Sequence, residues 1–289
     1  MQKQKQKVHW LVEDFERDNS FGELADEIRR QGHPCEVIRY VPFSSGDYSQ
    51  IWPEETCVVF QGSIQLARQI QRERGSWVPG PIADWRNYLC RIYYAYLGRF
   101  LLNEDYSMLP FGHLLYRKES LFERHGGSFF IRPDDGAKSF TGTLVTPDSL
   151  TGNSLKSFEY DTSPESLVVV APNRLIKREW RLVCIGDEVI TGSRHPQPRY
   201  KTFGQCDFRP DVPTEVIEYG EGILKAVSWR PDPVFILDIC ETSSLHLLEI
   251  GAFSVAGLYK CDLEKIVSRV SEVSLALWAD MQPGEGECP

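Results

Sequence analysis

Two acidic residues, Asp238 and Glu249, each stand at the end of an apolar run, in PVFILDI and LHLLEI. If these runs form adjacent antiparallel strands joined by a short turn, the two carboxylates lie close together. A carboxylate at the end of an apolar run is costly unless it is paired or binds a cation, and neither residue has a Lys or Arg beside it in the sequence. The pair therefore indicates either a divalent-cation site, for which Mg²⁺ fits best, or two solvent-exposed ends of a hairpin.

A second candidate for chemistry is the segment RPDDGAKSFTG, from Arg132 to Gly142. Its glycines, Gly136 and Gly142, allow backbone N–H groups to approach phosphate oxygens closely. Lys138 adds a mobile point charge, and Arg132 adds a planar charge on the preceding strand. The Walker pattern G-x-x-x-x-G-K-[ST] is absent. Taken alone, the segment is compatible with a phosphate-binding loop and with a plain hairpin turn.

The third candidate is REWR, residues 178–181, in which Glu179 and Arg181 share one face of a strand because side chains alternate. Such a pair indicates a charged functional face or a surface ion pair. His195 lies in the polar segment GSRHPQPR, where it is interpreted as a loop histidine, and its neighbour Arg194 could contact an anionic substrate. The sequence indicates no Ser-His-Asp or Cys-His relay.

The elements that position these residues follow from the apolar pattern. Strands are predicted at Val8–Val12, Cys35–Tyr40, Thr56–Gln61, Ser128–Arg132, Thr143–Val145, Ser166–Pro172, Arg178–Ile185, Glu188–Gly192, Pro233–Ile239 and Leu245–Ile250. Helices are predicted at residues 20–31, 63–73, 213–228 and 261–279, the third despite Gly220 and Gly222. The first five elements run strand, helix, strand, strand, helix, which is typical of a small α/β unit with a parallel sheet.

The length of 289 residues predicts two or three domains at roughly 100–200 residues per domain. We place one boundary near residue 95 and a second in the polar stretch 151–165. The predicted units are therefore residues 1–95, 96–165 and 166–282.

Composition excludes several classes of protein. A net charge of −9 argues against non-specific nucleic-acid binding, which needs Lys and Arg to neutralise phosphates. No apolar run approaches the roughly 20 residues that a membrane-spanning helix needs, and no signal-peptide pattern follows the basic N-terminus. Eight scattered cysteines form no C-x-x-C pair and no zinc-ligand spacing. We interpret them as reduced residues of a cytoplasmic protein with no membrane or nucleic-acid partner.

Taken in order, the three candidate segments resemble the ATP-grasp superfamily, in particular its carboxylate–amine ligases. The closing segment FILDIC…HLLEIGAFSVAGLY is similar to the family's metal-binding end, an Asp followed about ten residues later by Glu-x-Asn. The likeness covers roughly residues 95–280 and is greatest to a divergent bacterial and phage-associated clade. The resemblance implies an α/β protein with an N-terminal pre-ATP-grasp, Rossmann-like unit. A two-lobed ATP-grasp fold would follow, with the nucleotide between two antiparallel sheets.

The resemblance also implies roles for nucleotide-binding residues. Asp238 and Glu249 would hold Mg²⁺. Lys138, Gly136 and Gly142 would cover the β- and γ-phosphates of ATP, and Arg132 stands where the family usually has a phosphate-binding lysine.

The remaining implied roles belong to the adenosine and acceptor sides. Val169 and Ala171 would belong to a hinge whose backbone pairs with adenine, and Glu179 would meet the ribose. Arg181 would reach the γ-phosphate or the acyl phosphate, and the acceptor would enter near Arg194.

The implied reaction is ATP-dependent ligation. A small-molecule or peptide carboxylate attacks the γ-phosphate, ADP leaves, and an amine displaces phosphate from the acyl phosphate to form an amide. One departure from the family pattern is Gly251, which stands where the Asn of Glu-x-Asn is expected. Two alternatives therefore stay open: a non-catalytic nucleotide-binding or interaction protein, and a kinase on the same fold. The oligomeric state is also open, a homodimer being one option.

Overall fold

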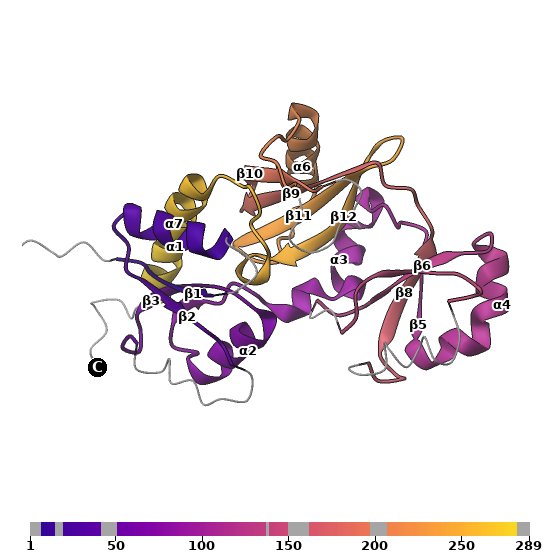
Figure 1. Cartoon of the computed structure of the whole chain (residues 1–289), viewed down its shortest axis with the longest axis horizontal. Coiled ribbons are helices and arrows are strands. Elements are labelled where there is room, and N and C mark those ends of the chain that lie inside the picture. The colour runs from indigo at the N-terminus through magenta and orange to yellow at the C-terminus, as the bar shows by residue number, and fades with distance from the viewer. Residues whose placement is uncertain are drawn as a thin grey trace, which may run out of the picture.

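The computed structural model describes residues 7–14, 20–41, 51–136, 139–149, 162–196 and 207–281. These residues form three four-stranded sheets that follow one another along the long axis of the molecule (Figure 1). We call them the N-terminal sheet (order β2-β1-β3-β4), the carboxylate sheet (β10-β9-β11-β12) and the loop-bearing sheet (β5-β8-β6-β7). The α/β class expected from the sequence is confirmed.

The strands of the N-terminal sheet are β1 (His9–Glu13), β2 (Cys35–Ile38), β3 (Cys57–Gln61) and β4 (Val78–Gly80). All of their pairings are parallel, as predicted. The helices that follow its strands are α1 (Ser20–Arg30) and α2 (Ile64–Glu73). Helix α2 begins at the Gly62-Ser63 turn because the Ser63 side chain accepts a hydrogen bond from the backbone N–H of Leu66.

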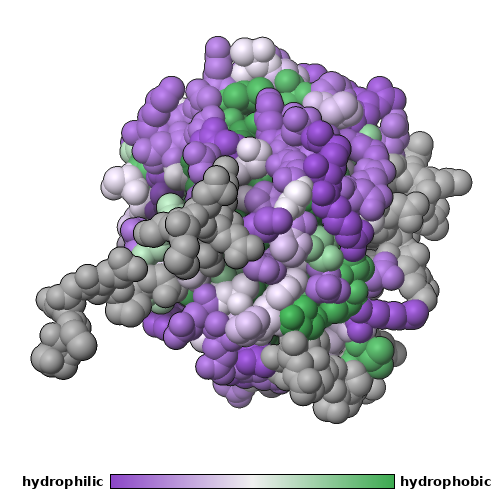
Figure 2. Space-filling model, turned by 90° about the vertical axis from the view of Figure 1, so that its left-hand side faces the viewer, coloured by the Kyte–Doolittle hydropathy of each residue, from purple (hydrophilic) through white to green (hydrophobic). Residues whose placement is uncertain are grey.

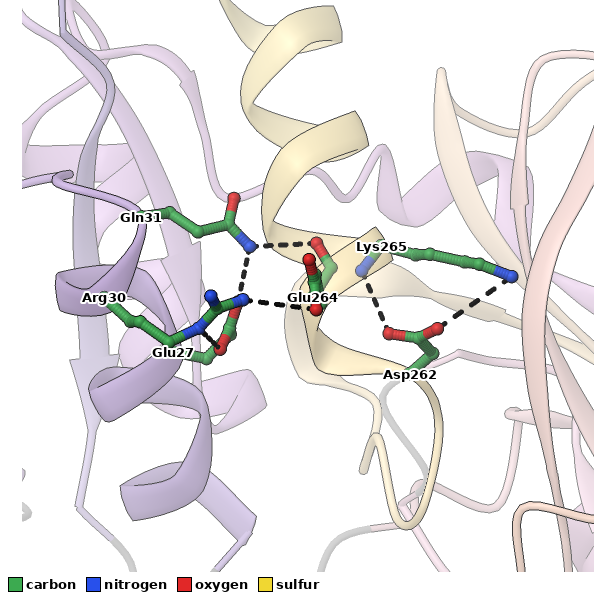
Figure 3. A network of polar contacts seen from close by, with 6 residues as sticks. All are labelled: Glu27, Arg30, Gln31, Asp262, Glu264 and Lys265. Carbon is green, nitrogen blue, oxygen red and sulfur yellow. Dashed lines mark hydrogen bonds and ion pairs between the residues drawn. The ribbon is translucent and has the colours of Figure 1, made fainter.

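Helix α7 (Leu263–Met281), at the far end of the chain, also packs on the N-terminal sheet. Its Ser271 accepts a hydrogen bond of 3.1 Å from the indole N–H of Trp10. Figure 3 shows how the first turn of α7 meets the end of α1: the Gln31 side chain donates to the Glu264 carbonyl at 3.0 Å, and Arg30 lies 3.2 Å from the Glu264 carboxylate. The surface of this end of the molecule is mostly hydrophilic, with small apolar clusters (Figure 2).

The carboxylate sheet is antiparallel throughout. Its strands are β9 (Arg178–Ile185), β10 (Glu188–Arg194), β11 (Val234–Glu241) and β12 (Leu245–Ala252). Helix α6 (Thr214–Ala226) covers one face, where Trp180 and Leu182 pack with Val216 and Ile223. Strand alternation therefore turns the intervening residues of β9 toward the other face.

The loop-bearing sheet is also antiparallel. Its strands are β5 (Ser107–Pro110), β6 (Phe129–Pro133), β7 (Thr143–Val145) and β8 (Leu167–Pro172). Two helices of this region, α3 (Cys90–Leu97) and α4 (Leu114–Arg124), have no counterpart in the sequence-based prediction. Four short 3-10 turns complete the described elements, at Trp85–Tyr88 (η2), Gly98–Phe100 (η3), Phe111–His113 (η4) and Phe253–Val255 (η5).

None of the helices within the described ranges is both long enough and apolar enough to span a bilayer.

Candidate nucleotide and metal site

Asp238 and Glu249 face each other across the β11–β12 pairing, as the sequence predicted. Both strands continue beyond their carboxylate, to Glu241 and Ala252, so the pair lies inside the sheet and not at its hairpin ends. Asp238 is only 2% exposed. Two solvent-exposed hairpin ends are therefore the wrong interpretation.

Arg181 of β9 binds the Asp238 carboxylate through two hydrogen bonds. The Nε atom donates to Oδ1 at 2.9 Å and Nη2 donates to Oδ2 at 2.7 Å, a bidentate geometry. Burial alone lowers the pKa of Arg181, but the charge of Asp238 and its hydrogen bonds outweigh burial and raise that pKa above its ordinary value. Because Glu179 and Arg181 are both buried, the interpretation of REWR as a surface ion pair is also wrong.

Glu249 has its own cationic partner, which comes from a different sheet. Arg132 lies on β6 of the loop-bearing sheet, and its Nη2 atom is 3.0 Å from Glu249 Oε2. Burial lowers the pKa of Arg132, yet the surrounding acidic groups, Tyr93, Cys90 and Glu249 among them, raise it overall. The sequence argument that no cation balances the two carboxylates is thus corrected, because strand pairing and sheet packing supply an arginine for each.

The donor set fits a Mg²⁺ ion that arrives with a nucleotide. Two carboxylates are hard oxygen ligands, and Mg²⁺ commonly takes one or two of these and completes its shell with phosphate and water oxygens. In the part of the chain that the structure describes, no three His, Cys, Asp or Glu side chains gather as a metal cage. Gly251 adds no oxygen, since it faces Ile236, whose Cβ would lie 3.5 Å from a Cβ built on the glycine. The two carboxylates would therefore need the nucleotide to complete the shell.

The glycines of the Arg132–Gly142 segment are required by close packing. A Cβ at Gly136 would lie 2.6 Å from the Cβ of Tyr88, and a Cβ at Gly142 would lie 2.5 Å from the ring of Phe130. A side chain is therefore excluded at both positions unless neighbours move. Lys138 lies outside the described residues.

The predicted hinge residues lie in β8, the strand between β5 and β6. Val169 and Ala171 are fully buried. Val169 has strand neighbours on both sides, Met108 and Arg132, whereas the described β5 pairing reaches only Val170. Backbone that is open to a ligand therefore begins near Ala171.

Glu179 and His195 come together at the other end of the carboxylate sheet. The His195 backbone N–H donates to the Glu179 carbonyl at 2.9 Å, and the His195 ring nitrogen lies 3.8 Å from the Glu179 carboxylate. Tyr259 packs against the His195 ring with centroids 4.9 Å apart, and its own ring lies 4.7 Å from the Arg181 guanidinium carbon. Sequence reasoning missed Tyr259 and left His195 as a loop residue, because neither sits in a motif.

Arg194 is turned away from this group. It pairs in register with Trp180, whose side chain lies on the α6 face of the sheet, and its guanidinium is 3.1 Å from Asp211. A cavity of about 370 Å³ adjoins Arg194 and is lined mainly by basic residues, among them Lys177, Arg178 and Arg209.

A family model for an ATP-grasp domain, which describes family 2 of one ATP-grasp clade, matches residues 113–268. Several solved structures share the fold. D-cycloserine synthetase DcsG aligns with TM-score 0.65 and 16% identity, covering 92% of this chain and 99% of that one. The D-alanine–D-alanine ligase of Bacillus anthracis, solved with ATP, aligns with TM-score 0.61 and 12% identity, covering 97% and 100%.

The ATP-grasp ligase PsnB, solved with a minimal precursor, Mg and ADP, aligns with TM-score 0.52 and 15% identity, covering 93% of this chain and 97% of that one. At such identities the likeness is one of fold. No curated protein matches the chain.

Proposed function

Because this chain belongs to the ATP-grasp family, in family 2 of the matching clade, we propose that it is an ATP-dependent ligase that joins a carboxylate to an amine. The observation that carries the proposal is the group of four charged residues between the two antiparallel sheets: Asp238 with Arg181, and Glu249 with Arg132. Buried charges are costly, and a cleft for a metal-bound polyphosphate is a site that uses both signs at once.

The four residues would divide the work by charge. Asp238 and Glu249 would hold Mg²⁺, which would supply charge neutralisation to the phosphates of ATP. Arg132 and Arg181 would turn from their carboxylates to phosphate oxygens, since a guanidinium binds both anions in the same bidentate manner. In-line phosphoryl transfer needs positioning and charge stabilisation, with no protein nucleophile, which agrees with the lack of a catalytic relay in the sequence.

The residues around this group would bind the rest of the substrates. Lys138, Gly136 and Gly142 would cover the phosphates, and the backbone near Val169 and Ala171 would meet adenine. Glu179 would bind the ribose hydroxyls. The chain would thus orient the transferred phosphoryl group and exclude water from the acyl phosphate.

The carboxylate and amine would be small molecules or peptides. The names of the structural neighbours support this range, since they include a D-cycloserine synthetase, a D-alanine–D-alanine ligase and a ligase bound to a precursor peptide. The basic cavity of about 370 Å³ beside Arg194 supports an acceptor that carries an anionic group. Arg178 and Lys177 line the same cavity and would add to this preference.

A cytoplasmic location is part of the proposal. Burial raises the pKa of Cys57 and of Cys261 to about 12 and that of Cys35 to about 11. Thiols with such pKa values stay protonated at neutral pH and react slowly, which agrees with reduced structural cysteines.

The test is magnesium-dependent ADP release with panels of carboxylates and amines. We expect Asp238→Asn and Glu249→Gln each to lower the rate by roughly 100-fold or more, because charge stabilisation in such sites is a dominant contribution. Glu241→Gln is the matched control, since Glu241 lies on the same β11 but pairs with the half-exposed Arg178. Unchanged turnover in the first two variants would show that the site assignment is wrong.

Gly251 favours a second candidate, a nucleotide-binding protein without ligase activity, because it removes a side-chain oxygen beside Glu249. Titration calorimetry that detects Mg-ATP binding, combined with no ADP release for any substrate pair, would support this candidate. A phosphorylated product without an amide would instead support a kinase.

A further inference from the structure

The entry to the glycine-containing loop, residues 134–136, is held by a segment outside its own sheet. Asp134 is 3% exposed, and its carboxylate accepts a hydrogen bond of 2.8 Å from the Arg91 backbone N–H and pairs with the Arg91 guanidinium. Its carbonyl accepts from the Cys90 N–H at 2.7 Å, and its own N–H donates to the Leu167 carbonyl at 3.0 Å. Both backbone groups and the carboxylate of Asp134 are therefore engaged.

These contacts make Asp134 the N-terminal cap of α3. The residue before the helix, Leu89, makes no side-chain capping bond, so a residue from the end of β6 supplies the acceptor that the first turn needs. A cap from a distant strand joins two elements, because neither can move without breaking the bonds.

The same segment contacts the loop at a second point. The backbone of Gly136 lies against Tyr88, where a Cβ would come within 2.6 Å of the tyrosine Cβ. The Tyr88 hydroxyl donates to the Asp232 carboxylate at 2.5 Å. Asp232 precedes β11, the strand that carries Asp238.

The far end of the segment reaches β12. The Leu102 N–H donates to the Leu247 carbonyl at 2.9 Å, two residues before Glu249, and Leu101 forms a bridge with Leu247. The stretch 85–102 is therefore joined to the loop entry on one side and to both carboxylate-bearing strands on the other. Figure 1 shows α3 between the two sheets.

We propose that Asp134 is a positioning residue, which holds the phosphate-binding loop at a fixed place relative to Asp238 and Glu249 through its bonds to α3. The inference rests on the proposed function, because the loop must meet phosphates for its place to matter. A displacement of about 1 Å in such a site can cost roughly 100-fold in rate, and Asp134 stands at the one described end of the loop that is bonded to a separate element.

The test compares the Kd of Mg-ATP with that of adenosine, which lacks the phosphates. In Asp134→Ala we expect the Kd of Mg-ATP to rise tenfold or more while the Kd of adenosine stays within twofold, by titration calorimetry well below the melting temperature. Asp134→Asn keeps an acceptor for the Arg91 N–H and should recover part of the affinity. Ser63→Ala, which removes the cap of α2 far from the loop, is the stability-matched control and should change neither Kd.

A purely structural role for Asp134 would lower the melting temperature and leave the ratio of the two Kd values at the wild-type level. Such a result, or equal weakening of both ligands, overturns the inference and leaves the proposed function intact. A wild-type chain that binds no Mg-ATP overturns both.

Discussion

Asp232 is the residue for which the structure supports the most definite stability experiment. Its carboxylate is mostly buried beside Tyr88 and Asp84, and burial, with a smaller contribution from the charge of Asp84, raises the pKa of Asp232 from 3.8 to about 6. The hydrogen bonds from the Tyr88 hydroxyl and the Asp84 N–H act in the opposite direction and offset only part of this rise. The change we consider is Asp232→Asn, which keeps an oxygen acceptor for Tyr88 and cannot ionise.

The sign follows from proton binding. The folded chain holds the Asp232 proton up to about pH 6, whereas the unfolded chain releases it near pH 4. Ionisation is therefore disfavoured by folding, and the stabilising effect of the protonated form is lost as pH rises from about 4 to 6. A rise from 3.8 to about 6 corresponds to about 3 kcal/mol at about 1.4 kcal/mol per unit. We expect Asp232→Asn to avoid that cost, so that its advantage over the wild type is small at pH 4.5 and about 2 to 3 kcal/mol at pH 7.5.

Urea unfolding of both proteins at the two pH values measures the difference. Asp26→Asn is the matched control, because the Asp26 side chain is 85% exposed and its replacement should change the free energy of unfolding little at either pH. An Asp232→Asn protein that is less stable than the wild type at pH 7.5, or whose advantage is the same at both pH values, would refute the reasoning.

Two further stability experiments follow from packing and charge. Gly220 and Gly222 lie in α6, where a Cβ at Gly220 would be 2.7 Å from a Leu182 methyl group and a Cβ at Gly222 would meet nothing within 4 Å. We expect Gly220→Ala to destabilise the chain by roughly 1–3 kcal/mol through overpacking and Gly222→Ala to stabilise it by about 0.5–1 kcal/mol, as urea midpoints would show; equal effects would contradict this. Arg181→Leu leaves Asp238 buried without its partner and should cost about 3–5 kcal/mol, most of which Arg181→Leu/Asp238→Leu should restore; a thermal melt in which the double variant is no more stable than the single one would count against a balanced buried pair.

Much of the fold was predictable because local patterns matched the final structure. The predicted strands Thr143–Val145 and Arg178–Ile185 have the same bounds in the structure as β7 and β9. The apolar runs around Asp238 and Glu249 form β11 and β12 in the expected antiparallel pairing. The domain boundaries near residues 95 and 165 stay predictions.

The partners of the two carboxylates could not be predicted, since they depend on strand order and sheet packing. Asp238 meets Arg181 because β9 lies beside β11 although β10 and α6 intervene in the sequence. Glu249 meets Arg132 because two separate sheets approach each other. Helix α3 was missed as well: its sequence, CRIYYAYL, buries residues on more than one side and shows no clean amphipathic period.

The packing of α7 on the N-terminal sheet has a consequence for biosynthesis. Val8, Trp10 and Val12 of the first strand share a core with Val267 and Val270 of the last helix, and the Trp10–Ser271 hydrogen bond joins residues 261 positions apart. At about 5–20 residues per second, a ribosome needs roughly 10 to 50 s to add that length of chain. The apolar face of the nascent sheet is uncovered during this interval, so this end of the protein is where a chaperone that binds exposed apolar segments would act.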